Sequence, residues 1–226
     1  MTPADLAVLR GSSAHVVVDQ IAAPELDDGD AHHLFRVLRL RDGEVVTVTD
    51  GAGSWRPCVV SGGEMVPDGE VRVEPASSQA LTIAWAIPKG ERPEWIVQKL
   101  AELGVDRILL LHTARSVVRW DGTRAERHLA KLRKVAVEAV QQSRGVWIPE
   151  LAGPLDAAEV LAGAVAAEPG GRDLAIDDRT IAVGPEGGWT DAELALARDR
   201  VTLGHRVLRV ETAAVAAAVR ALHHSL

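Results

Sequence analysis

The chain has 226 residues, of which 47% are hydrophobic, so it is long and apolar enough to fold around a buried core. Its net charge is −7, and this excess of acid lies in the first 75 residues, which hold 6 Lys and Arg against 13 Asp and Glu, because residues 76–226 hold 19 of each. The acidity excludes indiscriminate adhesion to nucleic acid, but the neutral C-terminal part leaves a specific RNA partner open.

The composition also bears on the compartment of the protein. No stretch approaches the roughly 18 consecutive apolar residues of a membrane helix, and the first residues lack the basic and then apolar order of a secretory signal. The sequence therefore predicts a soluble, cytoplasmic protein with no membrane contact. Cys58 is the single cysteine of the sequence, so an internal disulfide is excluded. It lies in an apolar, strand-like run, which predicts a packing role.

Up to about residue 75 the sequence predicts a small β-barrel or sandwich. Short runs of β-branched and apolar residues are separated by glycine turns, and one helical segment, residues 31–40, interrupts them. The predicted strands cover residues 15–18, 45–49, 56–60 and 71–74. A boundary near residue 75 gives a first domain of residues 1–75.

From Leu81 onward, strand patterns alternate with helix patterns, which is typical of an α/β domain with a mostly parallel sheet. This second domain covers residues 76–226. The predicted strands cover residues 81–87, 107–112, 174–176, 180–183 and 201–203. The predicted helices cover residues 93–103, 123–143 and 190–198, and a last helix begins at Glu211. Residues 163–171 are rich in small side chains and are predicted to form a flexible loop.

Two glycine-marked turns in the last third of the chain each join a strand to a helix. Residues 184–188 lead to a capping box with Thr190 as N-cap and Glu193 three residues on, and residues 203–210 lead into the last helix. Such turns expose backbone N–H and C=O groups to small ligands, although an ordinary strand-to-helix turn has the same glycines. We expect both turns to line one pocket, with Trp189 near it.

The turns also limit the kind of ligand. They lack the lysine of a phosphate-binding loop and the glycine spacing of a dinucleotide site, so a ligand without phosphates is favoured. An adenine ring, a ribose and a charged amino-acid tail suit backbone groups flanked by Leu203, Val207 and Leu208. No metal site is predicted, because the adjacent His32 and His33 point about 100° apart on a helix.

Basic residues form two clusters. On the predicted helix 123–143 they fall within one narrow stripe, and apolar residues lie on nearly the opposite side. A nucleic-acid backbone suits such a stripe, and a solvated helix face explains it equally well. The second cluster follows His33 and relieves the acidity of the first domain. The stripe consists of Arg124, Arg127, Lys131 and Lys134, and the second cluster consists of Arg36, Arg39 and Arg41.

Residues 184–188 together with residues 203–213 resemble the paired C-terminal motifs of the bacterial 16S rRNA (uracil-N3) methyltransferases, a family of the SPOUT superfamily. The resemblance extends over both domains. It includes Ala31-His32-His33, residues 36–39, Lys89-Gly90, Gln98-Lys99, residues 102–105, residues 138–144 and Pro149-Glu150. One departure is Gln141, where many relatives have a glutamate, and this weakens a catalytic role for that position.

The resemblance implies a PUA-like, RNA-binding β-barrel followed by an α/β domain whose chain forms a deep trefoil knot. It also implies that S-adenosyl-L-methionine is the cofactor, that it binds in the knot, and that the protein is a homodimer. The cofactor-binding residues that it implies are Thr113, Gly184, Pro185, Glu186, Gly188, Leu203, Gly204, Val207, Leu208 and Arg209.

The reaction that the resemblance implies is methylation of N3 of a uracil in 16S rRNA of the small ribosomal subunit. Glu211 is the first candidate for the base that takes the N3 proton and Glu186 the second, while Arg209 neutralises charge on the uracil oxygens. A capping role in the first helical turn explains Glu211 equally well. The implied RNA contacts are Arg36, Arg39, Arg124, Arg127, Lys131, Lys134, Arg144 and Arg206.

Two alternatives to this function stay open. A methyltransferase of the same fold could act on tRNA or on another base atom. A protein that keeps the fold without the reaction would be a non-catalytic RNA-binding module, although intact glycine turns speak against it.

Overall fold

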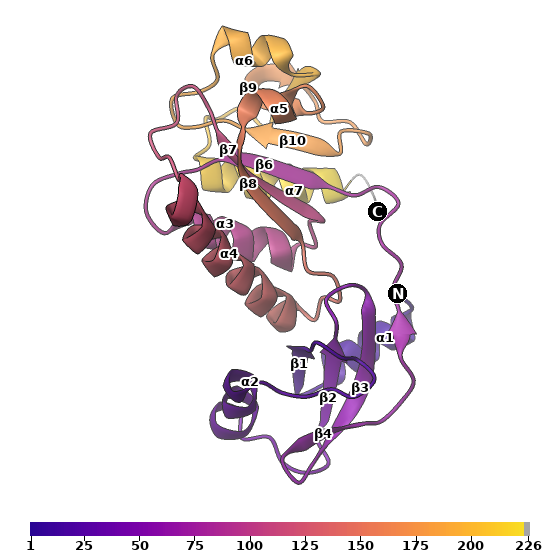
Figure 1. Cartoon of the computed structure of the whole chain (residues 1–226). Coiled ribbons are helices and arrows are strands. Elements are labelled where there is room, and N and C mark those ends of the chain that lie inside the picture. Colours follow the sequence, from indigo (N-terminus) through magenta and orange to yellow (C-terminus); the bar gives the residue numbers. More distant parts are fainter. Residues whose placement is uncertain (224–226) are drawn as a thin grey trace. The chain divides into compact units, whose positions relative to one another are not determined.

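The computed structural model describes residues 1–223, which form two compact units (Figure 1). The first unit contains Met1–Ala76 and also Val137–Ile148, and the second contains Ser77–Ala136 and the chain from Pro149 onward. The sequence predicts one boundary, after residue 75, and therefore assigns residues 137–148 to the second domain. Hydrogen bonds to residues of the N-terminal sheet and its loops hold this segment in the first unit.

The first unit is built on a five-stranded mixed sheet. Strand β1 pairs in parallel with β2, and β3 pairs antiparallel with β2, β4 and β5. Val46, Val48, Cys58 and Val60 alternate along two strands and are buried in one core. The sequence predicts every strand except β4, which is short and ends at a proline. The strands are β1 (Ala14–Val17), β2 (Val45–Thr49), β3 (Ser54–Ser61), β4 (Glu64–Pro67) and β5 (Arg72–Val73).

Two helical segments accompany this sheet. Helix α1 (Pro3–Gly11), which the sequence analysis does not predict, begins with a capping box in which the Thr2 hydroxyl and the Asp5 carboxylate each accept a backbone N–H. The predicted helix at residues 31–40 is present as α2 (Asp28–His32), which continues into the π-helical turn η1 (His33–Val37).

The end of helix α4 (Gly122–Ser143) and the residues after it are bonded into the first unit. Ile148 N–H donates to Gly51 O at 2.8 Å, and the Arg144 guanidinium donates to Ser12 O at 3.0 Å. The sequence predicts an RNA contact for Arg144, whereas the structure engages its half-buried guanidinium in this bond within the unit.

His15 makes a further bond to this segment. It is 4% exposed, its Nε2–H donates to Gly145 O at 2.8 Å, and its Nδ1 therefore accepts from the Thr47 hydroxyl at 2.8 Å. This arrangement suits a neutral ring. Burial accordingly lowers the pKa of His15 from 6.5 to about 4.

This buried histidine predicts acid sensitivity. The unfolded chain takes up a proton at His15 below pH 6.5, but the folded protein does so only near pH 4, so acid favours the unfolded state in that window. We expect His15 to remove about 3 kcal/mol from the free energy of unfolding as the pH falls from 6.5 to 4. Denaturant titrations across this range, compared with His15→Gln, measure the contribution. Equal pH dependence in the two proteins would contradict it.

The second unit is built on a six-stranded sheet in the order β11-β9-β10-β6-β7-β8, and all of its strand pairs are parallel. The strands are β6 (Thr82–Ala86), β7 (Arg107–His112), β8 (Glu150–Asp156), β9 (Val165–Arg172), β10 (Thr180–Val183) and β11 (Asp199–Val201). The helices that accompany α4 are α3 (Arg92–Glu102), α5 (Ala157–Leu161), α6 (Asp191–Leu196) and α7 (Val210–His223). The predicted α/β pattern is thus present.

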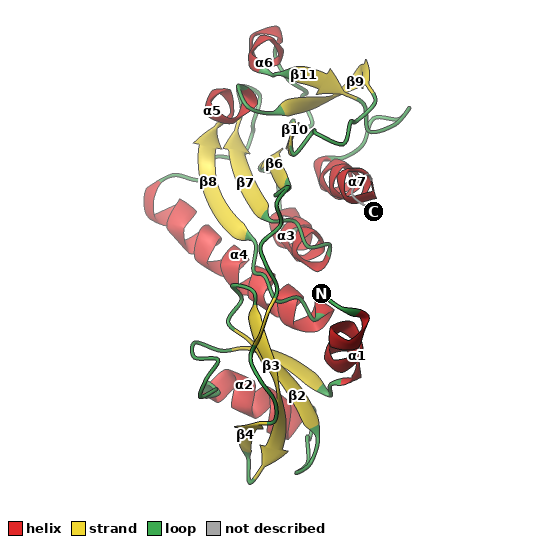
Figure 2. Cartoon of the chain, turned by 90° about the vertical axis from the view of Figure 1, so that its right-hand side faces the viewer, coloured by secondary structure: helices red, strands yellow, loops and turns green. Residues whose placement is uncertain are grey.

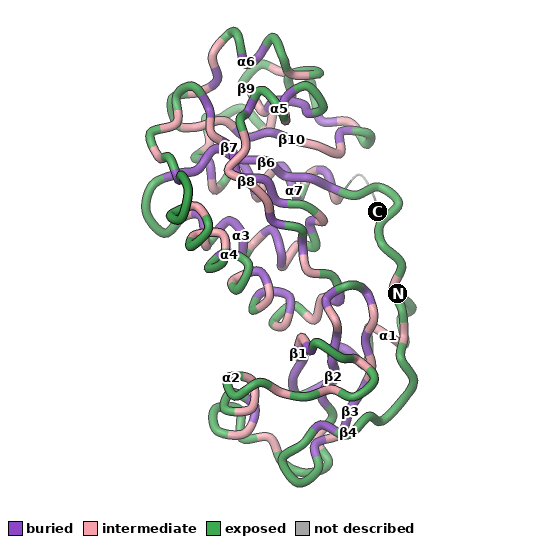
Figure 3. Tube along the Cα trace, viewed as in Figure 1, coloured by how far each residue is buried: buried purple, intermediate pink, exposed green. Residues whose placement is uncertain are grey.

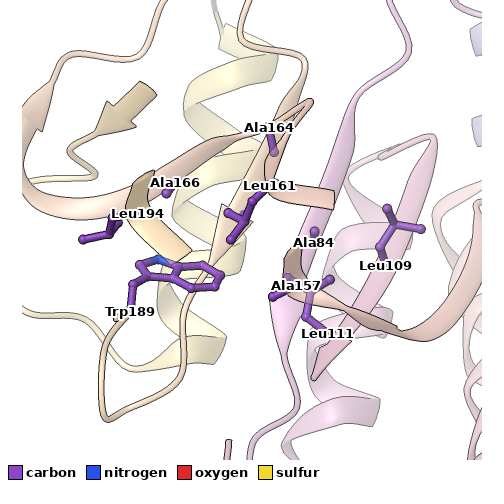
Figure 4. Packing of buried hydrophobic residues seen from close by; sticks show 10 residues of the cluster. Ala84, Leu109, Leu111, Ala157, Leu161, Ala164, Ala166, Trp189 and Leu194 are labelled. Atoms are coloured by element: carbon purple, nitrogen blue, oxygen red, sulfur yellow. The ribbon is translucent and has the colours of Figure 1, made fainter. Parts of the chain in front are cut away.

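Helices cover both faces of this sheet (Figures 1 and 2). Ala84 of β6 lies in a buried cluster with Leu161 of α5 and with Trp189 (Figure 4). Its neighbours Ile83 and Trp85 point to the opposite face and are fully buried. Helix α7 packs on β6, on β10 and on α3. The central strands are therefore buried along their length, as a parallel sheet requires (Figure 3).

Three predictions for this sheet are wrong. Residues 163–171, predicted as a flexible loop, contribute most of β9, a strand between β10 and β11. Glycine is required at position 171, because a Cβ there would lie 2.6 Å from the backbone nitrogen of Val201. Residues 174–176 form no strand, and the strand predicted at 201–203 lies at Asp199–Val201. The strand β8 and the helix α5 are not predicted at all.

Candidate active site

The two glycine turns meet at one cavity of about 200 Å³ in the second unit. The first turn lies at the carboxyl end of β10, where ligand sites of parallel sheets are usually found. The second turn follows β11 and leads into α7. The residues that border the cavity are 167–169 of β9, 183–186, 188, 189, 202–204, 206–208, Val210 and Ala213.

Most residues predicted to bind a cofactor border this cavity. They are Gly184, Pro185, Glu186, Gly188, Leu203, Gly204, Val207 and Leu208. Trp189 and Arg206 also border it, the first expected near the pocket and the second expected to bind RNA. Thr113 and Arg209 do not. Residues 167–169, which the sequence predicts as part of a loop, border the cavity as well. So do Val183, Thr202, Val210 and Ala213, which are not among the predicted cofactor-binding residues.

The first turn is shaped by close contacts. Gly188 N–H donates to Pro185 O at 2.8 Å, and Gly188 has a φ of +70°, which favours glycine. A Cβ at Gly184 would lie 2.9 Å from the indole ring of Trp189. That ring is held in turn by a hydrogen bond from its Nε1 to Ala167 O at 3.3 Å. The turn thus requires Gly184 and Gly188 for different reasons, and Trp189 ties it to β9.

One arginine joins a carboxylate of the first glycine turn to a carboxylate at the start of α7. Arg92 Nη1 donates to Glu186 Oε1 at 3.1 Å, and Arg92 Nε lies 3.6 Å from Glu211 Oε1. Glu186 is half exposed, whereas Glu211 is only 16% exposed. Its Oε2 is buried, and no hydrogen-bond donor reaches it within residues 1–223. Arg92 is not predicted as a site residue, since no local pattern at the start of α3 indicates partners so distant in the chain.

Glu211 and Arg209 take different positions around the start of α7. Glu211 lies in the first turn of the helix, as its capping alternative predicts. Arg209 is exposed, its carbonyl accepts the N–H of Ala213, and its side chain has no hydrogen bond or ion pair among the residues described. Neither residue borders the cavity, so of the three predicted catalytic residues only Glu186 does.

The predicted basic stripe lies on the exposed face of α4, and Leu132 and Ala136 are buried on the other face. Lys131 is not a free cation: its Nζ donates to Glu94 of α3 at 2.7 Å, and this hydrogen bond raises the pKa of Lys131. Within the described part of the chain, the other three side chains of the stripe have no partner. Arg36 and Arg39 of the first unit are likewise exposed.

Residues 1–223 contain neither a cluster of metal ligands nor a membrane-spanning helix. No group of three or more His, Cys, Asp and Glu side chains lies close enough together to hold a metal ion. None of the helices in this part of the chain has the length and apolar character needed to cross a membrane.

Comparison with known proteins identifies the family. Residues 75–222 match the model of an RNA methyltransferase domain, and residues 26–64 match that of an RNA methyltransferase PUA domain. The chain is 33% identical to ribosomal RNA small subunit methyltransferase E of Mycobacterium bovis, over 88% of this chain and 86% of the relative.

Solved structures agree with these matches. A methyltransferase of Legionella pneumophila in complex with the bound cofactor SAM is 28% identical, with a TM-score of 0.76 over 91% of this chain and 95% of that chain. Ribosomal RNA small subunit methyltransferase E of Neisseria gonorrhoeae, bound to S-adenosyl methionine, is 25% identical, with a TM-score of 0.72 and the same coverage. The predicted fold class, a parallel-sheet SPOUT methyltransferase domain after a PUA-like domain, is confirmed. The chain therefore belongs to the RNA methyltransferase family that includes ribosomal RNA small subunit methyltransferase E.

Proposed function

We propose that this chain uses S-adenosyl-L-methionine to methylate N3 of a uracil in 16S rRNA of the small ribosomal subunit. One observation carries the proposal: both glycine turns border a single cavity, and Arg92 joins Glu186 of the first turn to Glu211 at the start of the helix that follows the second. Relatives of similar fold have this cofactor bound, and curated relatives carry the name of a small-subunit rRNA methyltransferase.

The residues around the cavity fit this cofactor. Val183, Trp189 and Leu208 offer apolar surface for an adenine ring, and the glycine turns offer backbone donors and acceptors. Glu168 and Glu186 provide carboxylates that suit the ribose hydroxyls and the cationic amino and sulfonium groups. When bound, the cofactor supplies a methyl group that is already electrophilic, so the protein has chiefly to align it with the base and to remove a proton.

Arg92, Glu186 and Glu211 form a group that we call the Arg92 cluster. Within it, Glu211 is better suited than Glu186 to take the N3 proton. Glu186 already accepts a hydrogen bond from Arg92, whereas Glu211 Oε2 is buried and accepts none from the described residues. One guanidinium faces two carboxylates, so the cluster carries a net charge of −1 when all three groups are ionised. Arg92 thus orients Glu211 and still leaves it an oxygen able to accept a proton.

Arg209 and the unpaired basic residues are proposed to contact the RNA. The Arg209 side chain is exposed and has no partner among residues 1–223, which leaves its guanidinium free to neutralise charge on a uracil oxygen. Arg36 and Arg39 on the first unit, and the unpaired members of the α4 stripe with Arg206 on the second, hold backbone phosphates.

The stripe predicts a selective loss of RNA binding. Arg127→Glu is expected to weaken RNA binding by about tenfold at low salt and to reduce the salt slope by about one, because it removes a phosphate contact. Arg133→Glu changes the same charge on the same helix outside the stripe, and it is the matched control. Filter binding at several salt concentrations measures both variants. A parallel loss of S-adenosylmethionine affinity in Arg127→Glu would count against a role in RNA binding alone.

The proposal also includes the oligomeric state and the cellular location of the protein, both of which rest on its resemblance to the 16S rRNA (uracil-N3) methyltransferases. Two copies form a homodimer in the cytoplasm, and light scattering of the purified protein should give twice the mass of one chain. A monomeric mass at micromolar concentration would remove the dimer from the proposal.

The function itself is tested by transfer of a labelled methyl group. Purified protein is incubated with labelled S-adenosylmethionine and either small ribosomal subunits or tRNA. Label in 16S rRNA supports the proposal. Label in tRNA alone would favour the alternative substrate, and cofactor binding without transfer would favour a non-catalytic module.

A further inference from the structure

The loop after β7 is bonded to the first glycine turn through Arg115. The Arg115 Nη1 donates to Gly187 O and to Trp189 O, each at 3.0 Å. These carbonyls stand on either side of Gly188, which borders the cavity, whereas Gly187 and Arg115 do not border it. Arg115 therefore holds the turn although its own side chain does not border the cavity.

Glu193 makes a second link between the same two segments. It is 8% exposed, its Oε1 accepts Ala114 N–H at 2.8 Å, and its Oε2 accepts the N–H and the hydroxyl of Thr190, each at 2.8 Å. Burial acts to raise the pKa of Glu193, but the hydrogen bonds from Ala114 and Thr190 outweigh it and lower this pKa. The carboxylate is thus charged at neutral pH and joins the helix cap to the loop.

The loop that supplies these bonds is itself fixed. The Ser116 hydroxyl oxygen lies 3.0 Å from Thr113 N and 2.8 Å from Thr113 Oγ1. Thr113 is 2% exposed. Thr113 does not border the cavity, and its bonds within the loop give Ala114 and Arg115 a fixed base.

We propose that Arg115 and Glu193 are positioning residues that hold the first glycine turn in the conformation that binds the cofactor. The inference rests on the proposed function, because it assumes that S-adenosylmethionine occupies the cavity. A turn fixed before binding loses less conformational freedom when the ligand arrives, so its affinity is higher. Loss of the Arg115 bonds should weaken cofactor binding although Arg115 does not border the cavity.

Calorimetric titration with S-adenosylmethionine tests this role. Arg115→Ala is expected to weaken binding by about 10- to 100-fold, because it removes two charge-assisted hydrogen bonds. Arg115→Lys keeps the charge and should lie between Arg115→Ala and the wild type. Arg200→Ala is the matched control: Arg200 is an exposed residue of β11, its side chain has no partner among residues 1–223, and the same charge is lost.

Steady-state kinetics and hydrogen exchange separate positioning from general stabilisation. In Arg115→Ala the KM for S-adenosylmethionine should rise with little change in kcat at saturation, and amide exchange should quicken at residues 113–116 and 185–193 only. Wild-type affinity in this variant overturns the positioning role, as does faster exchange throughout the second unit. If the wild type itself fails to bind S-adenosylmethionine, the proposed cofactor is wrong and the positioning role falls with it.

Discussion

Glu211→Gln is expected to lower kcat for methyl transfer by about 100-fold or more, because it replaces the carboxylate that we propose as the proton acceptor by an amide of the same shape. Cofactor affinity should stay close to that of the wild type, since Glu211 does not border the cavity. Single-turnover rates with saturating S-adenosylmethionine and RNA, beside calorimetric affinities, measure both quantities.

Glu186→Gln is the matched control for this prediction. Glu186 already accepts a hydrogen bond from Arg92 and borders the cavity, so its replacement should raise the KM for S-adenosylmethionine more than it lowers kcat. Full turnover in Glu211→Gln would exclude Glu211 as the base and leave it as a first-turn residue of α7. A larger loss of kcat in Glu186→Gln would move the role to Glu186.

Arg92→Gln is expected to lower kcat by about 10- to 100-fold, because it removes the charge that two carboxylates share and the group that orients Glu211. Arg92→Lys keeps the charge but has no planar fork, so it should restore only part of the rate. The same single-turnover assay measures both variants, and thermal unfolding shows whether they remain folded.

Lys99→Gln provides the control on the same helix. Lys99 pairs with Glu102 three residues along α3, so this variant also removes one cation from a surface ion pair. Such pairs contribute about 1 kcal/mol or less to stability, and the turnover of Lys99→Gln should equal that of the wild type. Equal turnover in Arg92→Gln would show that the Arg92 cluster has no part in the reaction.

The strands and turns that the sequence predicts well are those with strong local signals. Residues 107–112 contain the apolar run 108–111, and residues 180–183 contain the apolar run 181–183; the structure has β7 and β10 within the predicted limits. The capping box at Thr190 is present as predicted. Glycine turns after such strands identify where a ligand cavity forms, because φ values above zero and close contacts both require glycine.

The missing parts depend on contacts that no local pattern carries. The alanine and glycine residues of β9 have little strand propensity, yet they lie in a strand between β10 and β11, and the close approach of β11 leaves no room for a side chain at Gly171. The assignment of residues 137–148 to the first unit follows from bonds to the N-terminal sheet. The trefoil knot is an expectation that comes from the family resemblance alone, because knots are nearly absent among proteins and no sequence pattern predicts one.

In the candidate site too, local motifs predict some features, and tertiary contacts that the sequence does not reveal decide others. Sequence motifs place Glu186 and Glu211 near one cavity, but only the structure shows that Arg92 joins them. Lys131 is predicted, as a member of the basic stripe, to contact RNA, and the structure pairs its Nζ with Glu94 of another helix. Charge patterns therefore indicate which faces are basic, and tertiary contacts decide which charges remain available to a partner.

Mapping of the modified nucleotide tests the central claim most directly. Small ribosomal subunits from a strain that lacks this enzyme are incubated with the protein and labelled S-adenosylmethionine, and the 16S rRNA is digested and analysed by mass spectrometry. We expect one 3-methyluridine per subunit, absent without the protein and greatly reduced with Glu211→Gln. A methyl group on another base atom, on a ribose or only on tRNA would contradict it.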